Sequence, residues 1–90
     1  MSVTVKLPTQ LRDLASGEAE ISVEGATVNE CLSGLFEAHP ALKDRLTDEN
    51  GVRRFVNLYL GGEDVRFLDG VETAVSPGAE ITVLPAVAGG

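Results

Sequence analysis

The sequence predicts an α+β fold, a roll in which one main helix covers one face of a mixed β-sheet. Apolar and polar residues alternate with period two towards both ends of the chain, as in strands with one buried face. In the middle of the chain, apolar residues recur every three or four positions, as on one face of a helix. Because 90 residues supply a single modest core, we expect one domain, residues 1–84, and a flexible C-terminal tail, residues 85–90.

The first two strands are predicted on either side of a turn. Apolar residues alternate with polar ones over residues 3–7 until Pro8, and again over residues 19–24. Ser16-Gly17, between these two segments, is typical of a turn. We therefore expect an antiparallel hairpin with one face open to water.

The main helix is predicted to begin at a capping box. In the segment from Thr27 to Glu30, the threonine and glutamate side chains are spaced to bond the free backbone N–H groups of a helix start. Helical periodicity continues to about residue 38, because Pro40 disfavours the helical conformation at His39. Pro40 is itself suited to open a second, short helical segment that reaches Leu46.

The segment after the helices predicts a loop and a second hairpin. Residues 47–54 are polar and are expected to form the loop, whereas residues 55–60 carry the strongest strand pattern of the chain. Gly61-Gly62 fits a two-residue hairpin turn, since glycine takes the positive φ angles that such turns require. Residues 65–67 are expected to form a short return strand.

Charge and composition exclude several classes of function. Lys plus Arg is 7 and Asp plus Glu is 14, a net charge of −7, so we expect no binding to free nucleic acid. We see neither an apolar segment long enough to span a bilayer nor a secretory signal, and we expect a cytoplasmic protein without membrane contact. The single cysteine provides neither an internal disulfide nor a metal cluster.

The chain ends in small, uncharged residues after a last predicted strand, residues 81–84, which follows a turn at Pro77-Gly78. Two terminal glycines are weak evidence alone, since frayed termini often carry glycine. An α-carboxylate on glycine, however, has no side chain beside it, so a nucleotide phosphate or a nucleophile can approach from either side. Gly90 is therefore the candidate reactive residue, to be activated by another enzyme as an acyl-adenylate. The residues predicted to thread into that enzyme are Pro85, Ala86, Val87, Ala88 and Gly89.

The tail and the segment around the third predicted strand together resemble a known family. The similar residues are Arg54-Phe55-Val56-Asn57, Glu63 to Phe67, and the closing Leu84-Pro85-Ala86-Val87-Ala88-Gly89-Gly90. This pattern is similar to that of the ubiquitin-like β-grasp sulfur carriers typified by ThiS and MoaD, and it looks most like the CysO branch. The resemblance covers nearly the whole chain and implies a ubiquitin-like β-grasp roll, with the mixed sheet packed on the main helix.

The resemblance implies a carrier cycle, with the chain as a protein co-substrate rather than an enzyme. An adenylyltransferase related to ThiF and MoeB uses Mg-ATP to form an acyl-adenylate at Gly90, and a sulfur donor converts this adenylate to a thiocarboxylate. The carrier itself binds no cofactor and no metal. In the CysO branch, the thiocarboxylate delivers its sulfur to a PLP-dependent cysteine synthase, and a metal-dependent peptidase then releases cysteine.

Other functions stay open. The same activated acyl group serves a ubiquitin-like protein modifier, in which Gly90 is joined to a lysine amine. Within the carriers, the sulfur acceptor is alternatively an intermediate of molybdopterin or thiamin synthesis. A further alternative is a plain interaction module with an inert tail.

Three polar or reactive features have ordinary interpretations. Cys31 lies near the apolar face of the main helix, where a lone cysteine is expected to be a small buried residue. His39, without a partner cysteine or histidine nearby in sequence, is expected to cap or pack the helix end. Asp48, Glu49 and Asn50 lack the spacing of a calcium loop and are expected to be solvated.

One face of the sheet is predicted to bind the activating enzyme. If residues 56, 58, 60, 81 and 83 face the helix, alternation places Phe55, Tyr59 and Leu84 on the other face. Exposed aromatic residues on a small sheet can mark a docking patch, and Arg54 adds a charge that orients the partner. The alternative is partial burial of this face under the Leu42 to Leu46 segment or a loop.

Overall fold

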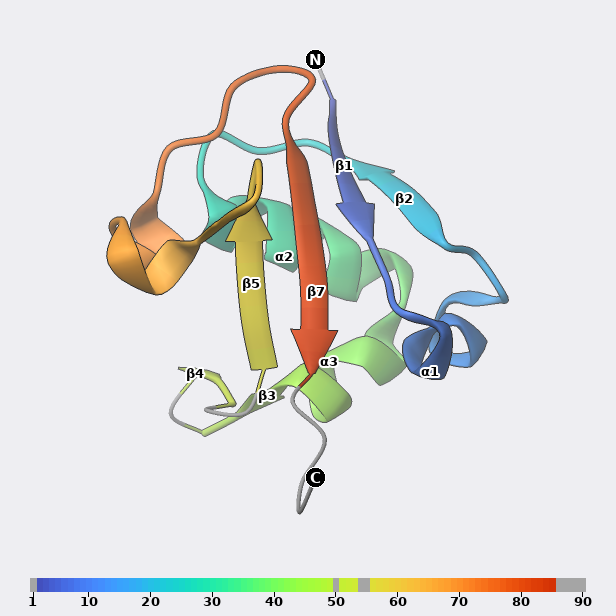
Figure 1. The fold of residues 1–90 in the computed structure, drawn as a ribbon. Coiled ribbons are helices and arrows are strands. Elements are labelled where there is room, and N and C mark those ends of the chain that lie inside the picture. Colours follow the sequence, from blue (N-terminus) through green and yellow to red (C-terminus); the bar gives the residue numbers. More distant parts are fainter. Residues whose placement is uncertain (1, 50, 54–55, 86–90) are drawn as a thin grey trace.

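The computed structural model describes residues 2–49, 51–53 and 56–85, and it contains a five-stranded sheet with helices packed behind it (Figure 1). The helices are α1 (Thr9–Arg12), α2 (Val28–Ala38) and α3 (Pro40–Leu46). Three 3-10 turns are η1 (Asp13–Ala15), η2 (Val65–Phe67) and η3 (Gly70–Glu72). The strands are β1 (Val3–Lys6), β2 (Glu20–Val23), β3 (Thr47–Asp48), β4 (Gly51–Val52), β5 (Val56–Leu60), β6 (Glu63–Asp64) and β7 (Glu80–Pro85).

The main sheet is mixed, as the sequence predicts. Its strand order is β2-β1-β7-β5-β6, so the last strand of the chain lies in the middle. β1 pairs with β2 in antiparallel fashion, which confirms the predicted first hairpin, and with β7 in parallel. β5 pairs with β7 and β6 in antiparallel fashion. The α+β prediction is therefore confirmed, with the N-terminal and C-terminal strands side by side.

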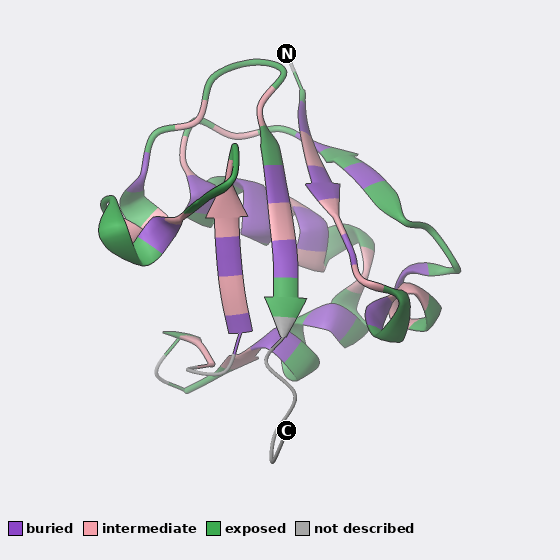
Figure 2. Ribbon diagram, in the orientation of Figure 1, coloured by how far each residue is buried: buried purple, intermediate pink, exposed green. Residues whose placement is uncertain are grey.

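The core lies between the sheet and α2. Buried residues alternate with partly or fully exposed ones along β1, β5 and β7, as the period-two pattern requires (Figure 2). Apolar residues of α2 at the three-and-four spacing are buried against these strands. The same core takes in Leu42 and Leu46 of α3. The sheet thus buries one face under the helices.

The start of α2 matches the predicted capping box. The Thr27 hydroxyl accepts a hydrogen bond from the Glu30 backbone N–H at 3.2 Å. The Glu30 carboxylate accepts one from the backbone N–H of Ala26 at 2.8 Å, one residue before the position that the motif usually bonds. α2 ends at Ala38, and α3 begins at Pro40, as predicted. No helix in the part of the chain that the structure describes has the length and hydrophobicity needed to span a bilayer.

Two sequence predictions around β5 are wrong. The predicted loop, residues 47–54, contains the paired strands β3 and β4. Each strand is only two residues long, so neither shows an alternation of apolar and polar residues that sequence analysis could detect. The predicted return strand, residues 65–67, is the turn η2, because the Asp64 carboxylate accepts a hydrogen bond from the Arg66 backbone N–H at 2.9 Å and caps a 3-10 turn there. The return strand is instead β6, directly after the predicted Gly61-Gly62 turn, whose φ angles are 59° and 93°.

The first hairpin contains a helix that the sequence reading does not predict. α1 and η1 fill the connection between β1 and β2, and they bury Leu11 and Ala15. These elements are four and three residues long, too short to show helical periodicity. The predicted turn follows them, with Ser16 at φ 57° and Gly17 at φ 84°.

Candidate functional site at the carboxyl end of β7

The first half of β7 is held on both sides. On one side, Thr4, Val5 and Lys6 of β1 lie opposite Glu80, Ile81 and Thr82. On the other side, Leu60 and Tyr59 of β5 lie opposite Ile81 and Thr82. Ile81 is 0% exposed. This half of the strand is therefore held firmly in the sheet, and it fixes the position from which the second half of β7 continues.

The second half of β7 is paired on one side only. Lys6 is the last β1 residue in the ladder, and Pro8, which lacks a backbone N–H, follows shortly after it. Leu7 donates its N–H to the carbonyl of Ala19 at 2.8 Å instead, on the side of β2. Val83, Leu84 and Pro85 therefore lie opposite β5 residues alone, and β7 runs past the end of β1 (Figure 1).

The predicted reactive residues continue from this strand end. Pro85 is the last residue of β7 and lies opposite Val56, so it belongs to the sheet. The described residues end before the predicted reactive residue, Gly90. They also exclude four of the residues predicted to thread into a partner: Ala86, Val87, Ala88 and Gly89. Their roles stay predictions. The structure shows where the tail is attached, namely at the end of β7.

The predicted docking face is partly located. Val56 and Leu58 are buried towards the helix, and alternation places Tyr59 and Leu84 on the opposite face of the sheet. Leu84 is 44% exposed and Tyr59 is partly buried. Phe55 and Arg54 lie outside the described residues. The α3 segment packs into the core on the helix side, so it does not cover Leu84, and the docking role of this face stays a prediction.

The same face carries one ion pair. The Lys6 ammonium lies 3.3 Å from a Glu80 carboxylate oxygen, and both side chains are about half exposed. Exposed pairs of this kind add little to stability.

Cys31 has the features of a structural residue. It is 0% exposed, and burial raises the pKa of its thiol, with the nearby Glu30 carboxylate raising it further. A Cβ placed on Gly25 would lie 3.0 Å from the Cys31 sulfur, so the thiol is packed against the backbone. The thiolate is the reactive form of cysteine, so a raised pKa makes Cys31 a poor sulfur-transfer residue.

His39 lies between α2 and α3. It caps α2, where its backbone N–H donates to the carbonyl of Leu35 at 2.9 Å, and it precedes Pro40 of α3. Its Nε2 lies 3.9 Å from a Glu18 carboxylate oxygen. Among residues 2–49, 51–53 and 56–85 no three His, Cys, Asp or Glu side chains gather as a metal site would require.

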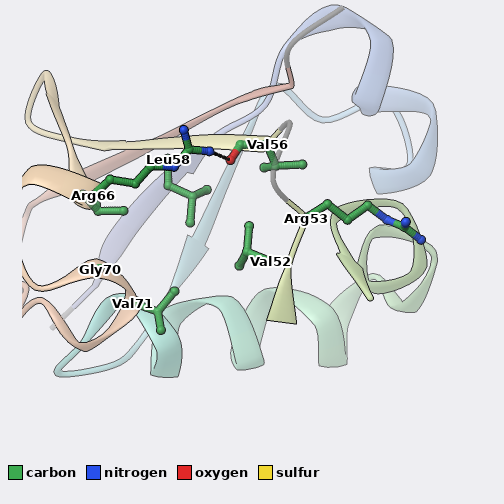
Figure 3. Close-up of a pocket in the computed structure, with 8 residues that line it drawn as sticks. Val52, Arg53, Val56, Leu58, Arg66, Gly70 and Val71 are labelled. Carbon is green, nitrogen blue, oxygen red and sulfur yellow. Dashed lines mark hydrogen bonds between the residues drawn. The ribbon is translucent and has the colours of Figure 1, made fainter. Parts of the chain in front are cut away.

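A cavity of about 420 Å³ on the helix side of β5 is a feature that the sequence does not reveal (Figure 3). Its apolar lining is Val52, Val56, Leu58, Val65 and Val71. These residues come from β4, β5, η2 and η3, the region where the sequence predictions of a loop and a return strand are wrong. No local pattern in the sequence indicates this cavity, because its lining comes from four separate elements.

Comparison with known proteins places the chain among small carrier and modifier proteins. A model of the ThiS family matches residues 5–90. The sulfur carrier protein CysO of Mycobacterium tuberculosis is 42% identical over 93 residues, a match that spans 100% of both chains. A chain in the crystal structure of the Amycolatopsis orientalis BexX/CysO complex superposes with a TM-score of 0.90 and 45% identity, covering 98% of this chain and 99% of that one. The solution structure of small archaeal modifier protein 1 from Methanosarcina acetivorans superposes with a TM-score of 0.89 and 32% identity, covering 99% and 96%.

Proposed function

Because this chain belongs to the ThiS family, with the ubiquitin-like β-grasp fold and the function of a sulfur carrier, we propose that its reactive group is the Gly90 α-carboxylate. A carboxylate oxygen of Gly90 attacks the α-phosphorus of ATP on a partner enzyme, and pyrophosphate leaves. A sulfur donor at the oxidation level of hydrosulfide then attacks the acyl carbon and loses its proton, and AMP leaves with the oxygen that joined it to the carbonyl. The product is a thiocarboxylate on Gly90.

The attachment of the tail supports this proposal. β7 is paired on both sides up to Thr82 and on one side up to Pro85, so its end is fixed relative to the domain. The five residues after Pro85 span at most about 17 Å when extended. They are Ala, Val, Ala, Gly and Gly, which are small or slender enough for a narrow channel. A docked partner therefore finds the carboxylate within a small volume, which raises its effective concentration at the active site.

The partners in this proposal follow from the chemistry of each step. A ThiF- or MoeB-like adenylyltransferase supplies the Mg-ATP site, so the nucleotide binds the partner and not the carrier. The thiocarboxylate sulfur then attacks the unsaturated carbon of an aminoacrylate held by a PLP-dependent cysteine synthase. The resulting thioester shifts from sulfur to nitrogen, and a metal-dependent peptidase hydrolyses the new amide to release cysteine and Gly90. The likeness to the CysO proteins supports cysteine as the product, and we propose that the carrier acts in the cytoplasm.

The face that carries Tyr59 and Leu84 is the proposed docking site for the adenylyltransferase, with Phe55 and Arg54 predicted to extend it. Leu84 is exposed one residue before the end of β7, and Tyr59 lies opposite Thr82 on the neighbouring strand. A partner that covers these side chains also surrounds the start of the tail. Apolar contact on this face and entry of the tail therefore occur together.

A second candidate function is conjugation of Gly90 to lysine amines. The likeness to small archaeal modifier protein 1 favours it, because an acyl-adenylate serves both fates. In the modifier, a lysine amine attacks the acyl carbon and forms an isopeptide bond. In the carrier, sulfur occupies that position and is later given away.

The proposal is tested by deleting Gly90 and measuring ATP–pyrophosphate exchange with the adenylyltransferase encoded in the same host. We expect exchange to fall to the background without carrier, while the circular dichroism spectrum and melting temperature stay unchanged. The matched control is Cys31→Ala, which removes the other candidate sulfur residue and should keep exchange at the wild-type rate. Exchange that survives the deletion, or that is lost in Cys31→Ala with the fold intact, contradicts the proposal.

A further inference from the structure

The outer edge of β2 is an open edge of the main sheet. β2 comes last in the strand order β2-β1-β7-β5-β6, so only one of its sides has a neighbouring strand among the described residues (Figure 1). At the other end of the sheet, β6 covers the edge of β5 at Tyr59 and Leu60, and the Arg66 guanidinium donates to the β5 carbonyl of Val56 at 2.9 Å. An unpaired strand edge presents backbone N–H and C=O groups with which another extended segment can pair.

The register of β1 shows which backbone groups of β2 point to this open edge. Thr4 of β1 donates its N–H to the carbonyl of Ala79 at 2.9 Å, on the side of β7. Thr4 lies opposite Ser22, so these two residues do not bond each other, and the ladder bonds are made by the residues on either side of them. Ser22 and, two residues before it, Glu20 therefore direct their N–H and C=O groups to the open edge. Both residues are exposed.

The negative charge of the chain is concentrated in the segment that contains this edge. Residues 13–42, which include β2 and α2, have six acidic residues and no Lys or Arg, whereas the rest of the chain has eight acidic residues and seven basic ones. The segment thus accounts for nearly all of the net charge of −7. All six acidic residues are exposed, and they are Asp13, Glu18, Glu20, Glu24, Glu30 and Glu37.

Carboxylates lie on both sides of the open edge. Alternation along β2 places the Glu20 side chain on the face of the sheet away from the helices. On the helix side, α2 approaches β2 at Gly34, where an added Cβ would lie 3.8 Å from the Val23 Cβ. Glu30 and Glu37 are four residues before and three residues after Gly34, so they border the same side of α2. A strand added to β2 would therefore have carboxylates near it on both faces.

We propose that the open edge of β2 binds an extended basic segment of a partner protein. The segment pairs with the backbone of Glu20 and Ser22 and places Lys or Arg side chains next to the carboxylates. Charge favours such a partner, because a basic segment is attracted to the acidic surface. A second copy of this chain would set the same acidic residues against one another, so the edge is unsuited to pairing with itself. This surface is separate from the docking face of Tyr59 and Leu84, since β1 lies between β2 and β7.

The test is titration of the ¹⁵N-labelled full chain with the blocked peptide acetyl-Lys-Val-Lys-Val-Lys-Val-amide. The control peptide, acetyl-Glu-Val-Glu-Val-Glu-Val-amide, has the same pattern of side chains with the opposite charge. In about 0.1 M salt, which screens distant charges, we expect saturable shifts of the β2 amide signals with the basic peptide and none with the acidic one. At saturation, exchange of the Glu20 and Ser22 amide protons with water should slow by at least about threefold, because strand pairing bonds both N–H groups.

Matched variants decide whether this edge is responsible. Glu20→Gln removes a charge at the open edge and should weaken binding of the basic peptide by about threefold. Glu63→Gln removes the same charge from β6, at the opposite edge of the sheet, and should leave the affinity unchanged. Ser22→Pro removes an outward N–H, which an edge strand tolerates, and should abolish the slowed exchange at Glu20. The amide spectrum shows whether each variant is folded; if Ser22→Pro is not, the two glutamate variants decide alone.

Four results would overturn the proposal. They are no saturation at millimolar basic peptide, equal binding of the acidic peptide, equal effects of Glu20→Gln and Glu63→Gln, and unchanged exchange at Glu20 and Ser22. The last result would mean that the peptide makes charge contacts without strand pairing. None of these results depends on Gly90, so this inference and the proposed function fail independently.

Discussion

The two halves of β7 differ in what holds them, and this difference separates stability from function. Glu80, Ile81 and Thr82 are paired with β1 on one side, and Ile81 and Thr82 are paired with β5 on the other. Val83, Leu84 and Pro85 are paired with β5 alone. Ile81 is fully buried, whereas Leu84 is 44% exposed on the face away from the helices.

In a chain of 90 residues, this contrast separates the strand residues that close the core from those that lead to the terminus proposed to be reactive. The first half of β7 closes the core by joining the N-terminal hairpin to β5. The second half leaves the domain in a fixed direction, and the predicted reactive tail begins where the sheet ends. Substitutions in the first half should therefore change stability, and substitutions in the second half should change recognition by partners.

The largest stability effect is expected in the first half. Ile81→Ala removes a fully buried side chain from the central strand, and we expect the free energy of unfolding to fall by about 2–4 kcal/mol. The matched variant Leu84→Ala truncates a partly exposed side chain on the same strand and should cost less than about 1 kcal/mol. Urea denaturation followed by circular dichroism measures both. Equal losses in the two variants would show that the halves are equivalent.

A smaller effect in free energy, but a large one in rate, is expected in the second half. The double variant Tyr59→Asp/Leu84→Asp places charge on the proposed docking face, so adenylation by the partner should slow by about tenfold or more. The melting temperature should change little, because neither residue is fully buried. Pyrophosphate exchange at several carrier concentrations measures the rate, with Tyr59→Phe/Leu84→Met as the apolar control. Wild-type activation of the charged variant removes the docking proposal.

The smallest effect is expected for the ion pair that joins β1 to the start of β7. Lys6→Ala breaks the contact with Glu80 at 3.3 Å, between side chains that are about half exposed. We expect a loss of less than about 0.5 kcal/mol, because water and salt screen such pairs. Denaturation at low and high salt checks this value. A loss comparable to that of Ile81→Ala would mean that charge, rather than packing, holds the two termini together.

Much of the fold could be predicted because the decisive signals are local. Alternation in residues 3–7 and 81–84 marks β1 and β7, and the capping residues Thr27 and Glu30 mark the start of α2. The two-residue strands β3, β4 and β6 could not be predicted, because an element of two residues shows no period. The spacing of Val65 and Phe67 alone indicates a strand. The structure has the turn η2 there instead, because the Asp64 side chain caps it.

The candidate site divides in the same way. Gly90 is suggested by the end of the sequence and needs no tertiary information. The lining of the cavity beside β5 comes from four separate elements, represented by Val52, Leu58, Val65 and Val71. Because these residues are distant in sequence, no single segment predicts the cavity. Arg66 is similar: its bond to the Val56 carbonyl joins residues ten positions apart and depends on how η2 turns.

The most direct measurement of the central claim is mass spectrometry of this protein purified from its native host. In the C-terminal tryptic peptide, which follows Arg66, we predict a Gly90 residue heavier by the difference between one sulfur and one oxygen atom. The same mass difference should persist in Cys31→Ala. An unmodified carboxylate in cells that require the protein for growth, or Gly90 found only in isopeptide bonds to lysine, would contradict the sulfur-carrier account.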